Sequence, residues 1–279
     1  AQEAATNTNR SIAGSLEKLS TGLKINKASD DASGLAIADK LRTQVTSINQ
    51  GISNGNSAIA LLQITDKSMA EQSKILDTIK SKLIQANTDT TSTAGRTAIA
   101  KDVTKLLQQL NNIGEQTNYN GTTLLQKART TADASKEGNL TAARTAKGGL
   151  SFQIGEGTAD LITTRTINSN VAGLKLSALA KAVRSGAKVS AGATAATTGV
   201  FTRTMAQSGQ KAIDKAITTL NGYRGDIGST QNQVESAVRN LMTQSTNIKA
   251  AESVIRDVDY AEESANFNKL NIISQAGSY

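Results

Sequence analysis

The chain of 279 residues contains no proline, cysteine, histidine or tryptophan. Without cysteine it forms no disulfide and performs no thiolate chemistry. Without histidine it lacks the usual general base near neutral pH and the commonest metal ligand. The absence of proline favours long uninterrupted helices, because proline removes a backbone donor and clashes with the preceding turn.

Aromatic residues make up only 3% of the chain, which favours a thin core of Leu, Ile, Val and Ala between helices. The net charge of +8 suggests either a nucleic-acid or anionic-membrane partner, or simply a basic solvated surface. Because Lys and Arg are scattered with no run of four, we favour the solvated surface and predict no nucleic-acid partner. We also predict no membrane insertion, since no apolar run approaches the roughly 18 residues that a spanning helix needs.

Two ladders of apolar residues recur with a spacing of seven near the two ends of the chain. A strict repeat of seven keeps one stripe facing a partner helix, and each ladder would extend for roughly 60 Å as a helix. The ladders therefore predict two long packed helices. Gly55 occupies the one small position of the first, where we expect a close approach between helices. The ladder residues are Leu41, Ile48, Leu62, Met69, Leu76, Leu83, Ile213, Leu220, Ile227, Val234, Leu241, Ile248 and Ile255.

The N-terminal part divides into three predicted elements. Residues 1–30 read as the end of a helix, broken at Thr21 and Gly22, and a connector. Ser29, Asp30 and Asp31 provide capping side chains for a helix that runs to about residue 86. After a polar loop at 88–95, apolar spacing predicts a second helix over 98–113, and the sequence at 118–121 predicts a turn.

The middle segment, 129–204, differs from both ends. Its stretches 151–154 and 161–167 are expected to form a β-hairpin or two short strands. Residues 187–199 predict a flexible turn or a short helix, and a long helix resumes at about 205 and continues to about 258. The predicted fold class is mainly α: an elongated, rod-shaped antiparallel helical bundle of long helices with a small β-hairpin region inserted in the middle.

Motifs that carry catalytic or metal chemistry are weak in this sequence. Asp257, Asp259 and Glu262 hint at calcium binding but lack the glycine and ligand spacing of an EF-hand loop. Gly155-Glu156-Gly157 begins like a dinucleotide fingerprint, without the βαβ pattern around it. No phosphate-binding loop or nucleophile elbow occurs. We therefore predict no catalytic, cofactor or metal site.

Several stretches carry a specific resemblance to bacterial flagellins. The segment at 15–26 (SLEKLSTGLKIN) resembles the family's SLxRLSSGLRIN, and those at 30–38 and 52–56 resemble DDAAGxAIA and ISNGNDA. The segments at 118–121 and 152–155 resemble the TxFNG turn and the FQIG strand, and 250–264 resembles the RDxDxAxE region. The resemblance covers residues 1–128 and about 205–279. The wording of the C-terminal stretch is nearest to flagellins of the Campylobacter-like group, and the sequence reads as terminally truncated.

The resemblance implies a structural subunit of the bacterial flagellar filament, self-assembling into an extracellular helical polymer for swimming motility. Its implied partners are other flagellin subunits, an export chaperone and the flagellar type III apparatus. By the same comparison, 1–30 holds the end of the inner coiled coil and the spoke, while 31–128 and 205–279 form the two halves of the rod domain. The truncated form is expected to be monomeric, because the family's outermost ends drive polymerisation.

The resemblance also implies a site for Toll-like receptor 5, formed in many flagellins by an Arg, a Leu and a Glu. The aligned positions here are Thr78, Lys82 and Asp102. Thr78 lacks the planar charged fork of Arg, and Lys82 places a charge where an apolar contact is expected. We therefore expect a poor agonist of this receptor.

Two other classes of function stay open as alternatives. One is a binding module, either a flagellin-like hook–filament junction protein or a soluble adhesin. The other is an enzyme carried in the middle segment, although residues 129–204 hold no His, no Cys and no cluster of acids.

Overall fold

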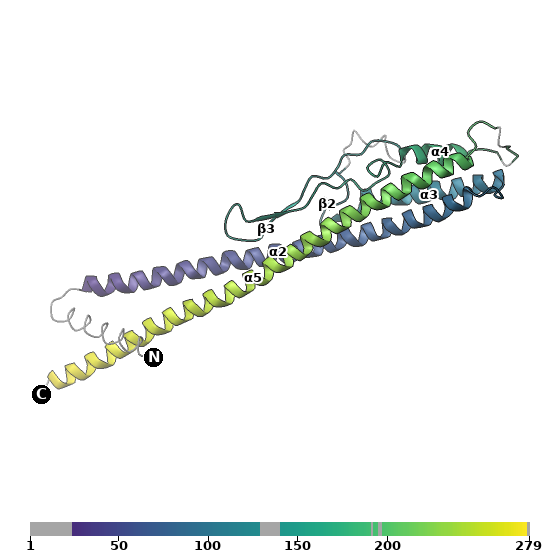
Figure 1. The fold of residues 1–279 in the computed structure, drawn as a ribbon. Coiled ribbons are helices and arrows are strands. Elements are labelled where there is room, and N and C mark those ends of the chain that lie inside the picture. Colours follow the sequence, from purple (N-terminus) through teal and green to yellow (C-terminus); the bar gives the residue numbers. More distant parts are fainter. Residues whose placement is uncertain (1–23, 129–139, 191, 195–196, 278–279) are drawn as a thin grey trace. The chain divides into compact units, whose positions relative to one another are not determined.

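The computed structural model describes the backbone of residues 24–128, 140–190, 192–194 and 197–277. Side chains are described for the same residues except 24–31 and 257–277. Of the predicted stub and spoke, 1–30, residues 1–23 lie outside the described residues, and the rest belongs to helix α2 (Lys24–Ala86). The elements (Figure 1) are α2 (Lys24–Ala86), α3 (Thr93–Gln116), β1 (Asn118–Tyr119), β2 (Thr122–Thr123), β3 (Ser151–Gln153), β4 (Leu161–Thr163), α4 (Ser177–Ala187) and α5 (Arg203–Gly277). The expected mainly α class with a small β-hairpin region is confirmed.

The chain divides into two compact units, and both long helices contribute to each. The first comprises Ala1–Gly55, Gln153–Asp160 and Ser236–Tyr279. Within it, α2 and α5 run antiparallel, because positions later in α2 contact positions earlier in α5. Ser245 Oγ lies 3.4 Å from Asn49 Oδ1, and a Cβ added at Gly55 would meet the Val238 side chain.

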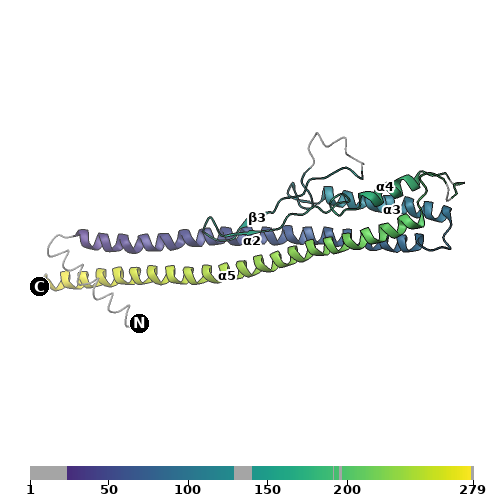
Figure 2. The ribbon, with the colours of Figure 1, turned by 45° about the horizontal axis from the view of Figure 1, so that its top comes forward.

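The second unit comprises Asn56–Phe152 and Leu161–Glu235. Its parts of α2 and α5 are also antiparallel: Arg224 Nε donates to Asp66 Oδ1 at 3.0 Å, and Lys80 Nζ lies 2.7 Å from Asp214 Oδ1. Here α3 and α4 pack against each other, as both ribbon views show (Figures 1 and 2). This unit holds most of the buried apolar side chains among the described residues.

The Asn-Gly turn predicted at 118–121 is confirmed as a tight β1–β2 hairpin. Asn118 pairs with Thr123, and Tyr119 pairs with Thr122. The two residues between the strands, Asn120 and Gly121, have φ values of 52° and 85°. Two consecutive positive values match the twist of the flanking strands, and Asn-Gly tolerates them best. The β-hairpin predicted over 151–154 and 161–167 is present as the two-stranded sheet β3–β4, shorter than expected.

Several predicted boundaries were wrong. The α2 helix begins at Lys24 rather than at the Ser29–Asp31 caps, because Lys24–Ala28 contains good helix formers and neither Gly nor Pro. At the other end, α5 continues past the predicted end near 258 to Gly277. The intervening residues again offer no helix breaker, and glycine is the usual residue at a helix end.

The helix α3 is longer at both ends than the predicted 98–113. It begins after Ser92, whose Oγ accepts a hydrogen bond from the Gly95 amide at 3.0 Å. Helix α4 was not predicted. It lies directly before the small-residue stretch 187–199 in which a short helix was left open, and it ends at Ala187.

Candidate functional site

The ladder residues of the second unit form the centre of its helix packing. All eight are at most 2% exposed: Leu62, Met69, Leu76, Leu83, Ile213, Leu220, Ile227 and Val234. Because α2 and α5 are antiparallel, the earlier rungs of one ladder are level with the later rungs of the other. At about 25 cal/mol per Å² of apolar surface, each buried Leu or Ile contributes roughly 1.5–3 kcal/mol before chain entropy is counted.

The ladder is less buried in the first unit. Ile48 is 1% and Leu241 is 6% exposed, whereas Leu41, Ile248 and Ile255 are only half-buried. The repeat of seven alone gives no signal of this difference, since each of these rungs is as apolar as those of the second unit.

Glycine at position 55 coincides with a close approach of α2 to α5, as predicted. A Cβ at Gly55 would lie 2.2 Å from Val238 Cγ2, and one at Gly51 would lie 3.1 Å from Leu241 Cδ1. The first distance is far inside van der Waals contact, so no larger residue fits at 55 without movement of the neighbouring helix face. The end of strand β3 also contributes here, since Asn54 Nδ2 donates to the Gln153 carbonyl at 2.9 Å.

The three receptor-equivalent positions lie on the surface of the second unit. The exposed Thr78 turns its hydroxyl to the Lys74 carbonyl at 3.0 Å. Lys82 Nζ lies 3.2 Å from Asp102 Oδ2, joining α2 to α3 through an ion pair with side chains 35% and 55% exposed. The structure therefore brings Lys82 and Asp102 together.

A buried polar cluster escaped the sequence analysis. Gln72 Nε2 donates to the carbonyls of Leu110 (3.1 Å) and Ser169 (2.9 Å). Asn111 Oδ1 accepts from the Val171 amide at 2.8 Å. We call this cluster the polar clasp; it fixes the segment after β4 against α2 and α3. Its members are at most 3% exposed: Gln72, Asn111, Gln126, Ser169 and Asn170.

The clasp also explains why position 114 of α3 is a glycine. A Cβ at Gly114 would lie 2.6 Å from the Ser169 carbonyl oxygen, so glycine allows the backbone of the later segment to approach the helix. Polar residues spaced irregularly along the sequence give no periodic signal, which is why the cluster could be found only from the fold.

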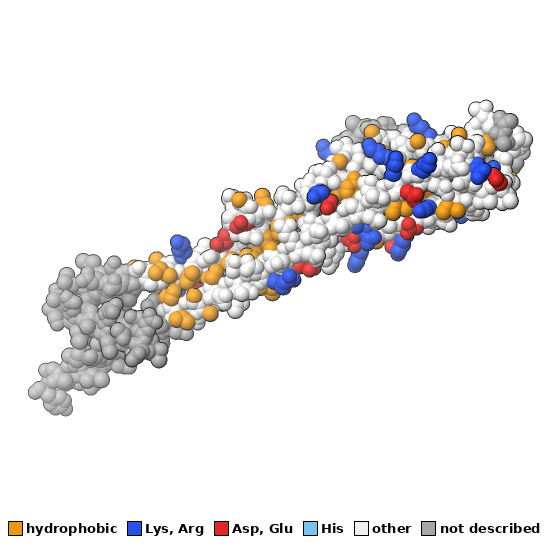
Figure 3. Space-filling model, in the orientation of Figure 1, with side chains coloured by type: hydrophobic (Ala, Val, Ile, Leu, Met, Phe, Trp, Pro, Cys, Tyr) orange, Lys and Arg blue, Asp and Glu red, His pale blue; other side chains and the backbone are white. Residues whose placement is uncertain are grey.

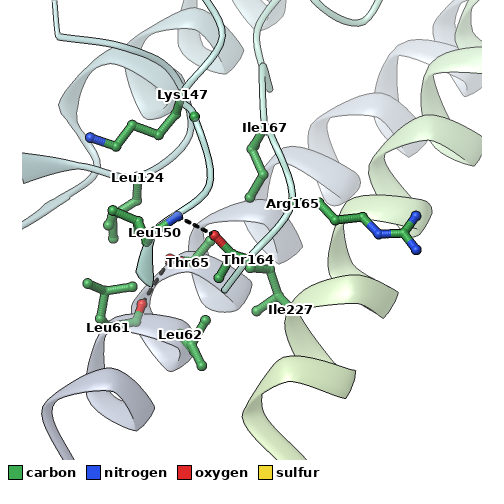
Figure 4. A pocket seen from close by; sticks show the side chains of 11 residues that line it. Leu61, Leu62, Thr65, Leu124, Lys147, Leu150, Thr164, Arg165, Ile167 and Ile227 are labelled. Carbon is green, nitrogen blue, oxygen red and sulfur yellow. Dashed lines mark hydrogen bonds between the residues drawn. The ribbon is translucent and has the colours of Figure 1, made fainter. Parts of the chain in front are cut away.

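Figure 4 shows a small pocket in the second unit, walled mainly by leucine and isoleucine side chains. Its volume of about 10 Å³ is near the minimum for one water molecule, so it is too small for an organic ligand. Thr164 Oγ1 accepts from the Leu150 amide at 2.8 Å, and Thr65 Oγ1 donates to the Leu61 carbonyl at 2.9 Å. The charged ends of Lys147 and Arg165 extend away from the pocket (Figure 4).

No metal or membrane-spanning feature occurs in the described part of the chain. Its residues contain no group of three or more His, Cys, Asp or Glu placed to hold a metal ion. None of its helices is both long and apolar enough to cross a bilayer. The acidic side chains considered for calcium, Asp257, Asp259 and Glu262, lie outside the described side chains.

Comparison with known proteins assigns both ends of the chain. Residues 1–130 match the bacterial flagellin N-terminal helical region, and residues 210–279 match the bacterial flagellin C-terminal helical region. The chain is 32% identical to a flagellin of Bacillus subtilis strain 168 over 280 aligned positions, covering 94% of this chain and 85% of that protein. The chain belongs to the flagellin family.

Two further matches are a relative of this flagellin and a solved structure. Flagellin A of Helicobacter felis is 54% identical over 121 residues, which are 43% of this chain but only 24% of that protein. A solved structure described as a flagellar hook-associated protein from Vibrio parahaemolyticus has a TM-score of 0.63 at 14% identity. That likeness covers 81% of this chain and 98% of the other, and it shows the fold alone. Members of the flagellin family are structural proteins of the flagellar filament outside the cell.

Proposed function

We propose that the flagellin that this sequence represents is a structural subunit that polymerises with copies of itself into a flagellar filament for swimming. The observation that carries the proposal is the family match at both ends of the chain, which contains α2 and most of α5. Copies related by one repeated rotation and translation would form an open helical polymer. In this role the chain is not an enzyme and needs no cofactor.

Exposed apolar side chains in the first unit support a polymer contact there. Leu35, Ile37, Met242 and Val254 are 51–61% exposed. Figure 3 shows apolar side chains gathered on this unit's parts of α2 and α5. Apolar surface of this kind is costly in water and is typical of a protein–protein contact.

The test is to express the gene that encodes this chain in a strain whose own flagellin gene is deleted. We expect filaments by electron microscopy and recovery of swimming. Ile37→Asp should reduce filament length sharply, whereas Ser53→Asp, at an exposed polar site of the same helix, should not. Absence of filaments with the unaltered gene, despite secretion of the protein, would contradict the proposed function.

The remaining roles extend the same proposal. We propose that the chain is exported unfolded by the flagellar type III apparatus with a chaperone, that 31–128 and 205–279 form the rod halves, and that 129–204 is the variable middle. The ladders are proposed to hold the subunit together.

The residues of the C-terminal stretch further suggest a source in the Campylobacter-like group, while the relatives reported above come from Helicobacter and Bacillus. A hook–filament junction protein is the second candidate, motivated by the shared fold of the Vibrio parahaemolyticus structure.

We also propose that this flagellin activates Toll-like receptor 5 poorly. The Lys82–Asp102 ion pair supports this, because a receptor contacting either side chain has to separate the pair or accommodate both charges. The neutral Thr78 offers no bidentate partner to a carboxylate.

A reporter-cell assay tests the receptor proposal. The unaltered chain should give a weak response, and the combined change Thr78→Arg, Lys82→Leu and Asp102→Glu should raise it at least about tenfold, equal to 1.4 kcal/mol of binding. Thr218→Arg is the matched control, since Thr218 is also exposed and bonds a backbone carbonyl in the same way. A strong response from the unaltered chain would refute the proposal.

A further inference from the structure

The net positive charge of the chain comes almost wholly from one segment. Residues 161–213 contain seven Lys and Arg and no Asp or Glu, whereas the rest of the chain holds 24 Lys and Arg against 23 Asp and Glu. This local excess of positive charge is not evident from runs of Lys and Arg, because the cations are scattered. The segment is basic because it lacks Asp and Glu.

Helix α4 and its C-cap place three of these cations on one side. Its inner face is buried through Leu179, Val183 and neighbouring small residues. Lys181 and Arg184 of α4 and Lys188, the residue that caps its C-terminal end with helical backbone angles, follow at spacings of three and four, which places them on one stripe extending for about 10 Å. Lys181 and Lys188 are exposed, and Arg184 is partly exposed. Figure 3 shows Lys and Arg side chains gathered in the region where Figure 1 places α4.

Most of these charges are not paired with an acidic side chain among the described residues. Of the seven cations, Arg203 pairs with Asp89 at 2.6 Å and Arg165 lies 3.8 Å from Asp226. No ion pair to another described residue is found for the other five: Lys175, Lys181, Arg184, Lys188 and Lys211. Like charges on neighbouring turns repel each other, so a stripe of this kind costs stability unless an anion shares it.

We propose that the α4 stripe (Lys181, Arg184 and Lys188) binds an anionic polysaccharide, a linear chain carrying sulfate or carboxylate groups. Such a polymer presents repeated charges along a line, which matches cations spaced along one side of a helix. Arg184 offers bidentate hydrogen bonds to a sulfate or carboxylate, and the lysines act as point charges.

The surroundings of the stripe disfavour two other polyanions. Single-stranded nucleic acid is held by exposed aromatic rings on which bases stack, and the only aromatic residue of 161–213, Phe201, is fully buried. An anionic membrane surface is bound by a helix that inserts apolar residues beside its cations. The large apolar side chains of α4, Leu179 and Val183, are instead buried in the protein, at 4% and 0% exposure.

The experiment measures binding of the full chain to heparin, as a sulfated probe, and to alginate, as a carboxylated probe, between low and moderate salt. The test variant is Lys181→Gln/Arg184→Gln/Lys188→Gln. The control variant, Lys40→Gln/Lys67→Gln/Lys249→Gln, makes the same change in net charge at exposed lysines outside the segment. Circular dichroism and thermal melting of all three proteins show whether each is folded.

We expect the test variant to weaken binding at least tenfold at low salt and the control variant to weaken it less than twofold. Affinity of the unaltered chain should fall steeply with salt, and the slope should be shallower for the test variant, because fewer counterions are released. Equal losses for the two variants would overturn the proposal, since they would show attraction to net charge alone. Binding of duplex DNA or of anionic phospholipid vesicles as tight as that of both polysaccharides would overturn it as well. These outcomes are independent of filament formation, so they do not decide the proposed structural role.

Discussion

The close approach of the two long helices at Gly55 allows one prediction to be worked through from distances. In an ordinary helix interior, replacing Gly by Ala stabilises by about 1 kcal/mol. At Gly55 the added methyl would lie 2.2 Å from Val238 Cγ2, so that the two groups have to separate by about 1.3 Å to reach the usual contact distance. Val238 is β-branched, and its side chain is held in one rotamer on a helix.

The balance of these terms sets the expected sign. Overpacking of this kind costs about 1–3 kcal/mol, which exceeds the gain in helix propensity. Gly55→Ala should therefore lower the free energy of unfolding by up to about 2 kcal/mol. Gly222→Ala is the control, because Gly222 is exposed on α5 and a Cβ there meets nothing within 4 Å. It should raise the free energy of unfolding by about 1 kcal/mol.

Urea unfolding followed by circular dichroism measures both changes, and amide exchange near residue 55 shows whether the effect is local. A double-mutant cycle with Val238→Ala isolates the contact. The shorter side chain makes room, so Gly55→Ala should be better tolerated in the Val238→Ala background by about 1–3 kcal/mol. If Gly55→Ala stabilises as much as Gly222→Ala and the cycle shows no coupling, the reasoning about a close approach is wrong.

Three further changes test single features of the second unit. Ser92→Ala removes the N-cap of α3 and should cost about 1 kcal/mol in urea unfolding, whereas Ser92→Asp should retain most of the stability. Gly121→Ala forces a side chain into the left-handed region and should cost about 1–2 kcal/mol, with loss of the hairpin's amide protection in hydrogen exchange. Gln72→Met leaves the buried carbonyls of Leu110 and Ser169 without their donor and should lower the free energy of unfolding by about 2–4 kcal/mol. An unchanged melting temperature would show that the clasp does not contribute to stability.

The two long helices were predictable because their signal is periodic. An apolar residue at every seventh position is visible without knowledge of the partner, and the second unit buries the rungs it contains. The Asn120-Gly121 turn was equally visible, since few residue pairs accept two positive φ values. Even the close contact at Gly55 followed from a small residue at a position where the repeat required a large one.

What could not be predicted depends on contacts between distant segments. Gln72 and Ser169 are nearly a hundred residues apart, and nothing local marks either as buried. The predicted start of α2 was wrong for a related reason. Ser29 and Asp30 are good N-caps, but a helix begins earlier when the residues before the cap also favour helix. Helix α4 was missed although Leu179, Ala180 and Val183 follow a helical spacing, because the short helix was considered only for the small-residue stretch 187–199, which begins where α4 ends.

The distribution of polar and charged groups separates two kinds of surface in the second unit. Where the segment after β4 meets α2 and α3, its polar groups are turned inward and nearly all are satisfied; among the described side chains only Asn111 Nδ2 is buried without a hydrogen-bond partner. A few residues later, α4 buries only apolar and small side chains and turns every cation outward. If the cations served only solubility, interspersed acids would serve as well and would avoid repulsion between neighbouring turns. A stretch of 53 residues without one acid therefore argues for a requirement outside the folded subunit, which a polymer of negative charge would meet.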